Sequence, residues 1–228
     1  MTLSFGPSES NPAGTAAAEK LLQAMGGADK VNSIKSLRQN VVAVRHGERI
    51  DIEQTIVYPD KQAQRMRLPE GNVLLVVTPS DAFTVRGSVE QNLPQSQRDA
   101  LNQTLKHDFI NVLQHIHDPK YIFFATGQEK VGDVEATVVD VEANGVPTRW
   151  WIGDDGKLLQ ERYSDLEQAG TSTQTMTYAD WKSFGGLDYP TKYILFAGST
   201  QPQMTMTLTE MEVNPEVSPK LFERPTSQ

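Results

Sequence analysis

Apolar and polar residues alternate with a period of two along most of this chain. In the segment 204–208 every second residue is apolar and threonines stand between them, and segments 174–178 and 49–53 show the same alternation. Successive side chains of a β-strand point to opposite faces of a sheet, so the pattern predicts a sheet with one apolar and one polar face. The apolar face needs a cover, and the helical segment 95–117 is the obvious candidate.

Turn-forming residues divide the alternating regions into about twelve strands. Pro69-Glu70-Gly71 and Asn144-Gly145 are examples of these breaks. Because the connections between successive strands are short, we expect the strands to pair in an antiparallel meander. The predicted strands are 36–46, 48–58, 62–69, 72–78, 82–87, 121–126, 134–143, 147–152, 157–164, 172–182, 190–197 and 203–213.

The helical segment 95–117 interrupts the strands once. Ser96 and Asp99 resemble a capping box at its start, and a break near His107-Asp108 would divide it into two shorter helices. Its apolar residues recur at spacings of three and four, the helical period. They are Leu101, Leu105, Phe109, Val112, Leu113 and Ile116.

The N-terminal region predicts two short helices in front of the sheet. Residues 1–14 are rich in Ser, Gly, Pro and Asn and are expected to form a disordered lead-in. Thr15 can cap a helix that ends at Gly26-Gly27, and a second helix is expected from 28 to about 34. We expect residues 15–228 to form a single domain. Its predicted class is mainly β (α+β), an incomplete antiparallel β-barrel of about 10–12 strands with a helical lid.

Composition excludes several classes of function. The formal net charge of −8 argues against a nucleic-acid partner, because phosphate binding needs clustered Lys and Arg. The chain has no cysteine, which excludes a disulfide scaffold, a thiolate zinc site and a cysteine nucleophile. No apolar run reaches the roughly 18–20 residues that span a bilayer. At the start of the chain we find neither a basic nor an apolar segment of a signal peptide.

The sequence offers no convincing catalytic or metal site. His115 and His117 could lie on one strand face, but they follow a predicted helix, where histidine also complements the helix dipole. No G-x-S-x-G elbow, P-loop or dinucleotide fingerprint is present. The acidic pairs Asp51/Glu53 and Glu210/Glu212 alternate with apolar residues and are expected to face water. We therefore predict no catalytic residue, metal or cofactor.

Methionines and aromatic residues at inward positions are the more informative set. Methionine is flexible and polarizable, so surfaces rich in it accommodate varied apolar shapes. Two interpretations remain open: an ordinary core packed under the helix, or a groove for an acyl chain or similar ligand. The predicted groove residues are Met66, Leu68, Leu74, Val76, Phe83, Leu105, Phe109, Val112, Leu113, Trp150, Met176, Tyr178, Tyr193, Leu195, Met204 and Met206. On the groove hypothesis, Phe109→Ala should weaken ligand uptake more than folding.

In the order and spacing of several short motifs, the chain resembles the LolA/LolB-like periplasmic lipoprotein-carrier superfamily over about residues 16–225. More closely, it resembles the bacterial outer-membrane lipoprotein-sorting proteins. The motifs are Leu21-Leu22-Gln23-Ala24-Met25-Gly26-Gly27, Ile34-Lys35-Ser36-Leu37-Arg38, Tyr58-Pro59-Asp60-Lys61, Leu93-Pro94, Asp108-Phe109-Ile110-Asn111-Val112-Leu113, Tyr189-Pro190, Val213-Asn214-Pro215 and Leu221-Phe222-Glu223-Arg224-Pro225.

The resemblance implies an unclosed barrel with a helical lid that binds the acyl chains of a lipid or lipoprotein without catalysis. It also implies a periplasmic location, with the signal peptide removed from this chain. The implied partners are a lipid or acylated protein and inner- or outer-membrane proteins, and we expect a monomer. The classical carrier has an arginine before the proline that corresponds to Pro59, where this chain has Tyr58. The alternative is an interaction or envelope-sensor module of the same fold, with a packed core and no small ligand.

Overall fold

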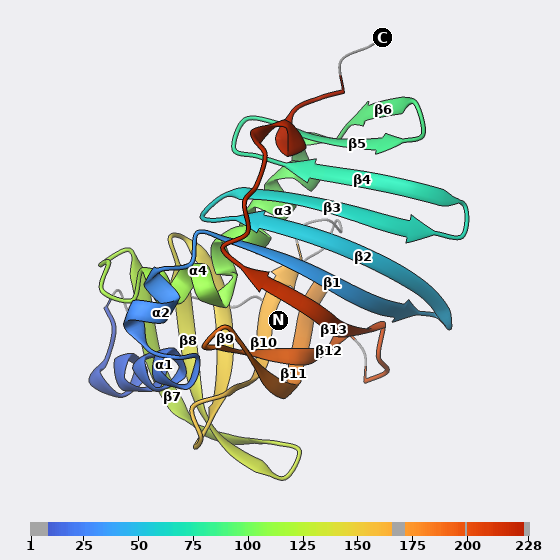
Figure 1. The fold of residues 1–228 in the computed structure, drawn as a ribbon. Helices are drawn as coiled ribbons and strands as arrows, with labels where there is room; N and C mark the ends of the chain where they lie inside the picture. The colour runs from blue at the N-terminus through green and yellow to red at the C-terminus, as the bar shows by residue number, and fades with distance from the viewer. Residues whose placement is uncertain (1–8, 166–171, 199, 226–228) are drawn as a thin grey trace.

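One antiparallel sheet of 13 strands curls around the molecule without closing on itself (Figure 1). The computed structural model describes residues 9–165, 172–198 and 200–225. The strands are β1 (Ser36–Arg45), β2 (Glu48–Val57), β3 (Lys61–Leu68), β4 (Gly71–Val77), β5 (Ala82–Arg86), β6 (Val89–Asn92), β7 (Tyr121–Val131), β8 (Val134–Ala143), β9 (Val146–Gly153), β10 (Leu158–Asp165), β11 (Ser172–Phe184), β12 (Leu187–Ala197) and β13 (Met204–Val213). The helices are α1 (Pro12–Ala24), α2 (Ala28–Asn32), α3 (Gln95–His107), α4 (Phe109–Gln114) and the 3₁₀ helix η1 (Pro219–Phe222).

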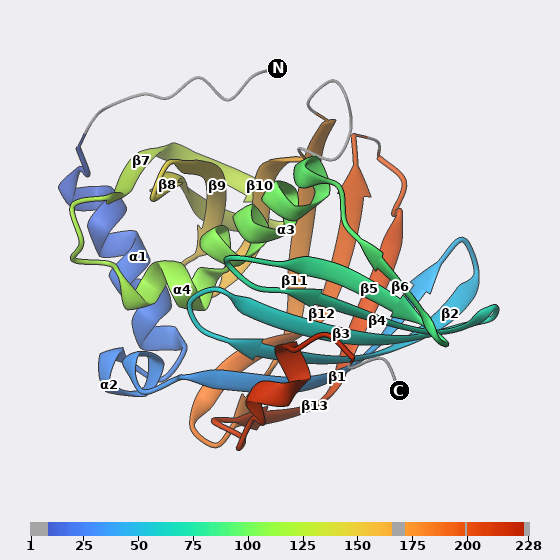
Figure 2. The same ribbon diagram turned by 90° about the horizontal axis from the view of Figure 1, so that it is seen from above.

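The order of the strands explains why the helical segment crosses the opening of the sheet. Strands β1 to β6 form one meander and β7 to β13 another, and the two join where β1 pairs with β13. The free edges are therefore β6 and β7, which are consecutive in the sequence. The chain between them must pass from one edge to the other, and it does so as α3 and α4, which lie inside the curl (Figure 2). The predicted fold class is confirmed, with β6 as a strand that the sequence pattern did not predict.

Register assigns each strand residue to an inner face, toward the helices, or to an outer face. Paired residues of antiparallel strands share a face, so one inner row runs through Trp150, Glu161, Met176, Leu195 and Met204. Three irregularities shift this phase among the described strands: one where β1 meets β13, one where β10 meets β9 and one where β7 meets β8. Each reverses the face of the residues that follow it on one strand.

Helix α1 begins four residues earlier than the sequence indicated. Its N-cap is Asn11 rather than Thr15, because the Asn11 side chain accepts a hydrogen bond from the N–H of Gly14 at 2.7 Å. The same side chain donates to the carbonyl of Ala125 and accepts from its N–H, both at 3.0 Å, which covers part of the β7 edge. Residues 12–14 are therefore helical, while 1–8 of the predicted lead-in lie outside the described residues.

The helical segment divides as expected but begins differently. Asp108 ends α3 and caps α4, so the predicted break near His107-Asp108 is confirmed. The capping box predicted from Ser96 and Asp99 is wrong: the N-cap of α3 is Pro94, and no side chain bonds the helix end. The Asp99 carboxylate instead accepts a hydrogen bond from the side chain of Gln95.

The main core lies between α1, α2, α4 and the inner face of the sheet. All five residues from Phe109 to Leu113 are buried, whereas α3 buries only Leu105 and His107. The two helices of the cover therefore differ, since α4 belongs to the core and α3 lies over the sheet with most of its residues partly or fully exposed. Within the described ranges, none of the helices combines the length and apolarity that crossing a membrane requires.

Candidate functional site: the groove beneath α3

The structure separates the predicted groove residues into three groups. The first group lies in the main core around α4. Phe109 packs its ring 5.7 Å from Tyr178 in an edge-to-face arrangement and 5.2 Å from Tyr189. The members of this group are Phe109, Val112, Leu113, Trp150, Tyr178, Tyr193 and Met206. Since these side chains contact one another, this part of the predicted groove is filled by protein.

The second group lies beside an open space. Leu195 of β12 and Met204 of β13 are paired neighbours on the inner face, and both line a pocket of about 440 Å³ beneath α3. Met176 precedes Leu195 in the same inner row. Leu105 packs from α3 against Ile56 and Val77, beside this space rather than in it.

The third group lies elsewhere on the sheet. Leu74, Val76 and Phe83 are on the outer face, where they form a cluster with Leu221 and Phe222 of the C-terminal segment. Their assignment to an inward groove is therefore corrected: β4 is apolar on both faces, so its alternation did not reveal the phase. Met66 and Leu68 share the inner phase of β3, but neither lines the pocket beneath α3.

The pocket beneath α3 combines an apolar wall with polar groups that include one arginine. Its apolar lining consists of Ala100, Leu101, Val146, Pro147, Leu195 and Met204. Its polar lining consists of Arg45, Gln103, Thr104, His107, Tyr163, Ser164, Gln174 and Gln203. Among these described lining residues there is no Asp or Glu, although the chain has a net charge of −8. The volume falls within the range of ordinary small-ligand pockets.

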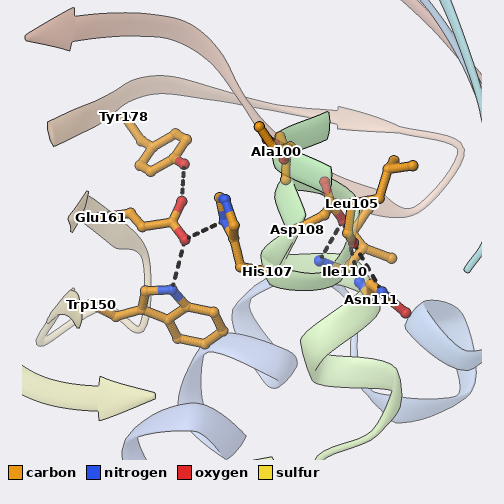
Figure 3. A network of polar contacts seen from close by, with 10 residues as sticks. Ala100, Leu105, His107, Asp108, Ile110, Asn111, Trp150, Glu161 and Tyr178 are labelled. Atoms are coloured by element: carbon orange, nitrogen blue, oxygen red, sulfur yellow. Dashed lines mark hydrogen bonds and ion pairs between the residues drawn. The ribbon is translucent and has the colours of Figure 1, made fainter. Parts of the chain in front are cut away.

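A buried carboxyl group ties α3 to the sheet at the inner end of this pocket. Glu161 of β10 is 3% exposed, and its Oε1 accepts from Nε1 of Trp150 at 3.3 Å while its Oε2 accepts from the hydroxyl of Tyr178 at 2.8 Å. Nδ1 of His107, at the end of α3, lies 3.1 Å from Oε1 (Figure 3). The His107 ring also lies 4.5 Å from that of Tyr163, which lines the pocket. Buried polar groups need such partners, so this cluster holds one end of α3 in place.

A second polar contact holds the junction between α3 and α4. Oδ1 of Asp108 accepts from the N–H groups of Ile110 and Asn111, at 3.1 and 3.3 Å, and from the hydroxyl of Tyr58 at 3.0 Å. Tyr58 precedes Pro59 in the connection between β2 and β3, so this contact joins the cover to the other half of the sheet. Tyr58 thus contacts the cover from the position where the carriers that the chain resembles have arginine.

Burial raises the pKa of the Asp108 carboxyl group to about 6, although its hydrogen bonds from Asn111 and Tyr58 lower it. In the folded protein this group therefore holds its proton to a higher pH than in the unfolded chain, whose carboxyl has a pKa near 3.8. Its contribution to stability is fully present below about pH 4 and is lost as the pH rises through about 6.

Asp108→Asn removes this titration while it keeps an oxygen for the N-cap. Relative to the wild type, the free energy of unfolding of the variant should rise by about 2–3 kcal/mol between about pH 4 and 7, because the buried carboxylate no longer forms. Urea unfolding at several pH values measures this difference. Tyr58→Phe, which removes a group that lowers the Asp108 pKa, should move the upper limit of the window to higher pH. If the free energy of unfolding changed with pH in the same way for Asp108→Asn and the wild type, the raised pKa of Asp108 would be contradicted.

A larger hollow of about 760 Å³ lies over β1–β5 and is lined mostly by outer-face residues. Charged side chains there neutralise one another, as in the Arg49–Asp51 pair at 2.8 Å and the Arg65–Glu53 pair at 3.1 Å. The predicted outer placement of Asp51, Glu53, Glu210 and Glu212 is confirmed by these pairs and by contacts across β1 and β13. This hollow is therefore a solvated, ion-paired surface.

The histidine pair that the sequence offered as a weak metal candidate is not arranged as a metal site. Nδ1 of His115 lies 2.7 Å from the carbonyl oxygen of Asn111, to which it donates, and its ring stacks on Tyr121 at 4.9 Å. His117 is exposed. In the parts of the chain that the structure describes, no three His, Asp or Glu side chains converge as metal ligands would.

Sequence pattern alone did not reveal Glu161, Asp108 or His107 as the polar contacts of the cover. His107 and Asp108 were recognised only as a break in the helix, a position where a polar pair is common. Glu161 follows the phase shift between Leu158 and Gln160, so simple alternation from Leu158 places it on the wrong face. An acidic residue between Gln160 and Arg162 offers no other signal that it is buried.

Comparison with known proteins identifies the fold through structure and not through sequence. No family model and no curated protein matches the sequence. A DUF1329 family protein from Desulfovibrio piger is similar over 92% of this chain and 97% of its own, with a TM-score of 0.60 and 10% identity. A LolA superfamily protein from Nitrosomonas europaea is similar over 91% and 97%, with a TM-score of 0.59 and 14% identity. A structure described as an outer membrane lipoprotein-sorting protein domain, from Vibrio parahaemolyticus, is similar over 92% and 96%, with a TM-score of 0.56 and 10% identity. The open sheet with its crossing helices is therefore a LolA-like fold.

Proposed function

We propose that this protein is a non-catalytic binding or carrier protein of the bacterial periplasm, for lipids or lipid-anchored proteins. The pocket between α3 and the inner face carries the proposal, because it is an open space with an apolar wall inside a covered sheet. Burial of an acyl chain stabilises a complex by about 0.8 kcal/mol per methylene group, so a modest pocket suffices for binding. The LolA-like fold, shared with a domain described as lipoprotein-sorting, supports the class of cargo and the location.

The different burial of α3 and α4 supports a cover in which one helix moves and the other is fixed. Helix α3 buries only Leu105 and His107, and neither belongs to the core around α4. It can therefore move without exposing that core. We propose that α3 is the lid of the pocket and that α4 is fixed. A ligand would enter between α3 and the ends of β12 and β13.

A second candidate is an interaction or sensor module without a small ligand. The packing around α4 favours it, since Phe109, Ile110, Val112 and Leu113 are each at most 4% exposed and fill that half of the interior. Such a module would contact a partner protein through the outer surface of α3 or a sheet edge. Ligand uptake distinguishes the two candidates.

Adjacent residues of β12 provide a matched pair of variants for this test. Leu195→Trp places an indole in the pocket, whereas Ile194→Trp places the same indole on the outer face, opposite Thr205 of β13. We expect Leu195→Trp to lower the affinity for a fluorescent fatty acid about tenfold or more, and Ile194→Trp to leave it unchanged. Urea unfolding of both variants checks that the fold is retained. Equal uptake by both would place the ligand outside this pocket, and failure of the wild type to bind any amphiphile would favour the second candidate.

Native mass spectrometry of the protein after mild extraction from cells provides an independent test. The carrier proposal predicts a bound species of lipid mass on the wild type and a lower occupancy on Leu195→Trp. A protein of bare mass, together with absence of uptake in solution, would exclude lipid carriage.

A further inference from the structure

We propose that the pocket beneath α3 binds an amphiphile with a single apolar chain and one negative charge, and that Arg45 receives the charged head. This inference rests on the proposed function and names the chemistry of its ligand. It begins from the lining of the pocket, which holds one arginine and no described carboxylate in a protein of net charge −8. Glu48 stands opposite Arg45 on β2, but it forms no ion pair with Arg45 among the described residues and does not line the pocket. Because the described lining contains an arginine and no carboxylate, it favours an anion over a neutral or cationic head.

Arg45 stands at the end of β1, on the inner row that continues through Met204 to Leu195. The chain of a ligand can therefore lie along the apolar side chains of Met204 and Leu195 while its head stays beside the guanidinium. Arg45 is exposed and forms no ion pair in the ranges that the structure describes, whereas Arg38, Arg49 and Arg65 on the outer face each pair with a carboxylate. A guanidinium without a protein carboxylate is available for a ligand carboxylate or phosphate.

The remaining polar groups fit the same head. Gln203 lines the pocket together with Arg45, and its amide group can donate to the oxygens of a carboxylate or phosphate ester. Leu101 of α3 lines the opposite side, so the lid contributes to the apolar wall. The chain of the ligand would thus lie between Met204 and Leu195 of the sheet and Leu101 of the lid, with its head beside Arg45.

Binding of dodecanoate and dodecanol, which share a chain and differ in charge, tests the proposal. By titration calorimetry, we expect the wild type to bind dodecanoate about tenfold more tightly, since a charge-assisted hydrogen bond contributes about that difference. Arg45→Gln should lower the dodecanoate affinity about tenfold and leave dodecanol unchanged. Arg67→Gln, which removes an exposed arginine of the outer face, should change neither.

Two further ligands distinguish the sources of the negative charge. Lysophosphatidylglycerol with a dodecanoyl chain carries the charge on a phosphate, and inorganic phosphate carries it without a chain. We expect the lysolipid to lose affinity in Arg45→Gln as dodecanoate does, and inorganic phosphate alone to bind weakly. If only dodecanoate responds to the substitution, the ligand class narrows to carboxylates.

Some outcomes would overturn the inference. Equal affinity of the wild type for dodecanoate and dodecanol, or no effect of Arg45→Gln, would refute the Arg45 head site and leave amphiphile binding intact. Equal losses in Arg45→Gln and Arg67→Gln would reduce the effect to general surface charge. Absence of binding for every amphiphile would overturn the proposed function together with the head site.

Discussion

Glu161→Ala should lower the free energy of unfolding by about 3–5 kcal/mol, because it removes the acceptor of a desolvated cluster. Trp150 Nε1 and the Tyr178 hydroxyl would lose the acceptor to which each donates, and His107 would lose its carboxyl neighbour. Glu161 is 3% exposed, so water cannot replace the lost hydrogen bonds unless the core opens. Urea unfolding followed by circular dichroism measures the loss.

Glu129→Ala is the matched control for this substitution. Glu129 also accepts from an indole, that of Trp151 at 2.9 Å, but it lies exposed on β7 and water can take its place. We expect Glu129→Ala to lower the free energy of unfolding by less than about 1 kcal/mol. Glu161→Gln keeps one accepting oxygen, so its loss in the free energy of unfolding should lie between those of Glu161→Ala and Glu129→Ala. A loss for Glu161→Ala no larger than that of the control would show that the cluster is solvated.

Phe109→Ala should also lower the free energy of unfolding by about 3–5 kcal/mol, as truncation of a buried aromatic ring does. The ring is 4% exposed and contacts Tyr178 and Tyr189, so the substitution leaves a cavity under α4. Phe124→Ala, the same truncation at a partly buried position of the edge strand β7, should cost about 1–2 kcal/mol. Calorimetric or urea unfolding of both variants compares the two sites.

The functional consequence of Phe109→Ala is the reverse of the one that the sequence suggested. Phe109 does not line the pocket beneath α3, so the folded fraction of the variant should bind a fluorescent fatty acid with wild-type affinity. Leu195→Trp should show the opposite behaviour, with lower affinity and nearly unchanged stability. If Phe109→Ala lost affinity at full stability, the ligand would reach α4 and the division of the cover into a fixed and a moving helix would be wrong.

Most of the fold could be predicted from the chain because its physical causes are local. Alternation identified the strands, turn residues separated them, and the helical period marked 95–117 as the interruption. Strand β6 was missed because Val89–Asn92 has too few apolar residues to alternate, and all four are exposed on an edge. The start of α1 was misplaced because Asn11 is fixed as a cap by its additional contacts with Ala125, more than a hundred positions away.

The candidate site could be predicted only in part, because phase along a strand is a local property and pairing is not. Alternation placed Met204 and Leu195 correctly on the inner face. Strand β4 has apolar residues on both faces, so its sequence does not show which residues point inward, and Leu74 and Val76 were assigned to the wrong face. Glu161 was hidden by a single extra residue in β10 that reverses the phase against β9.

By itself, the sequence determined a one-sided meander interrupted by one helical segment, and hence a covered sheet without recognisable catalytic residues. Only the tertiary structure decided which helix belongs to the core and which lies largely exposed over the sheet, and where the interior stays open. The reason is that burial depends on the partner as well as on the residue. Phe109 contacts Tyr178 and Tyr189, whereas Leu195 lines a space beneath α3 that no described side chain fills.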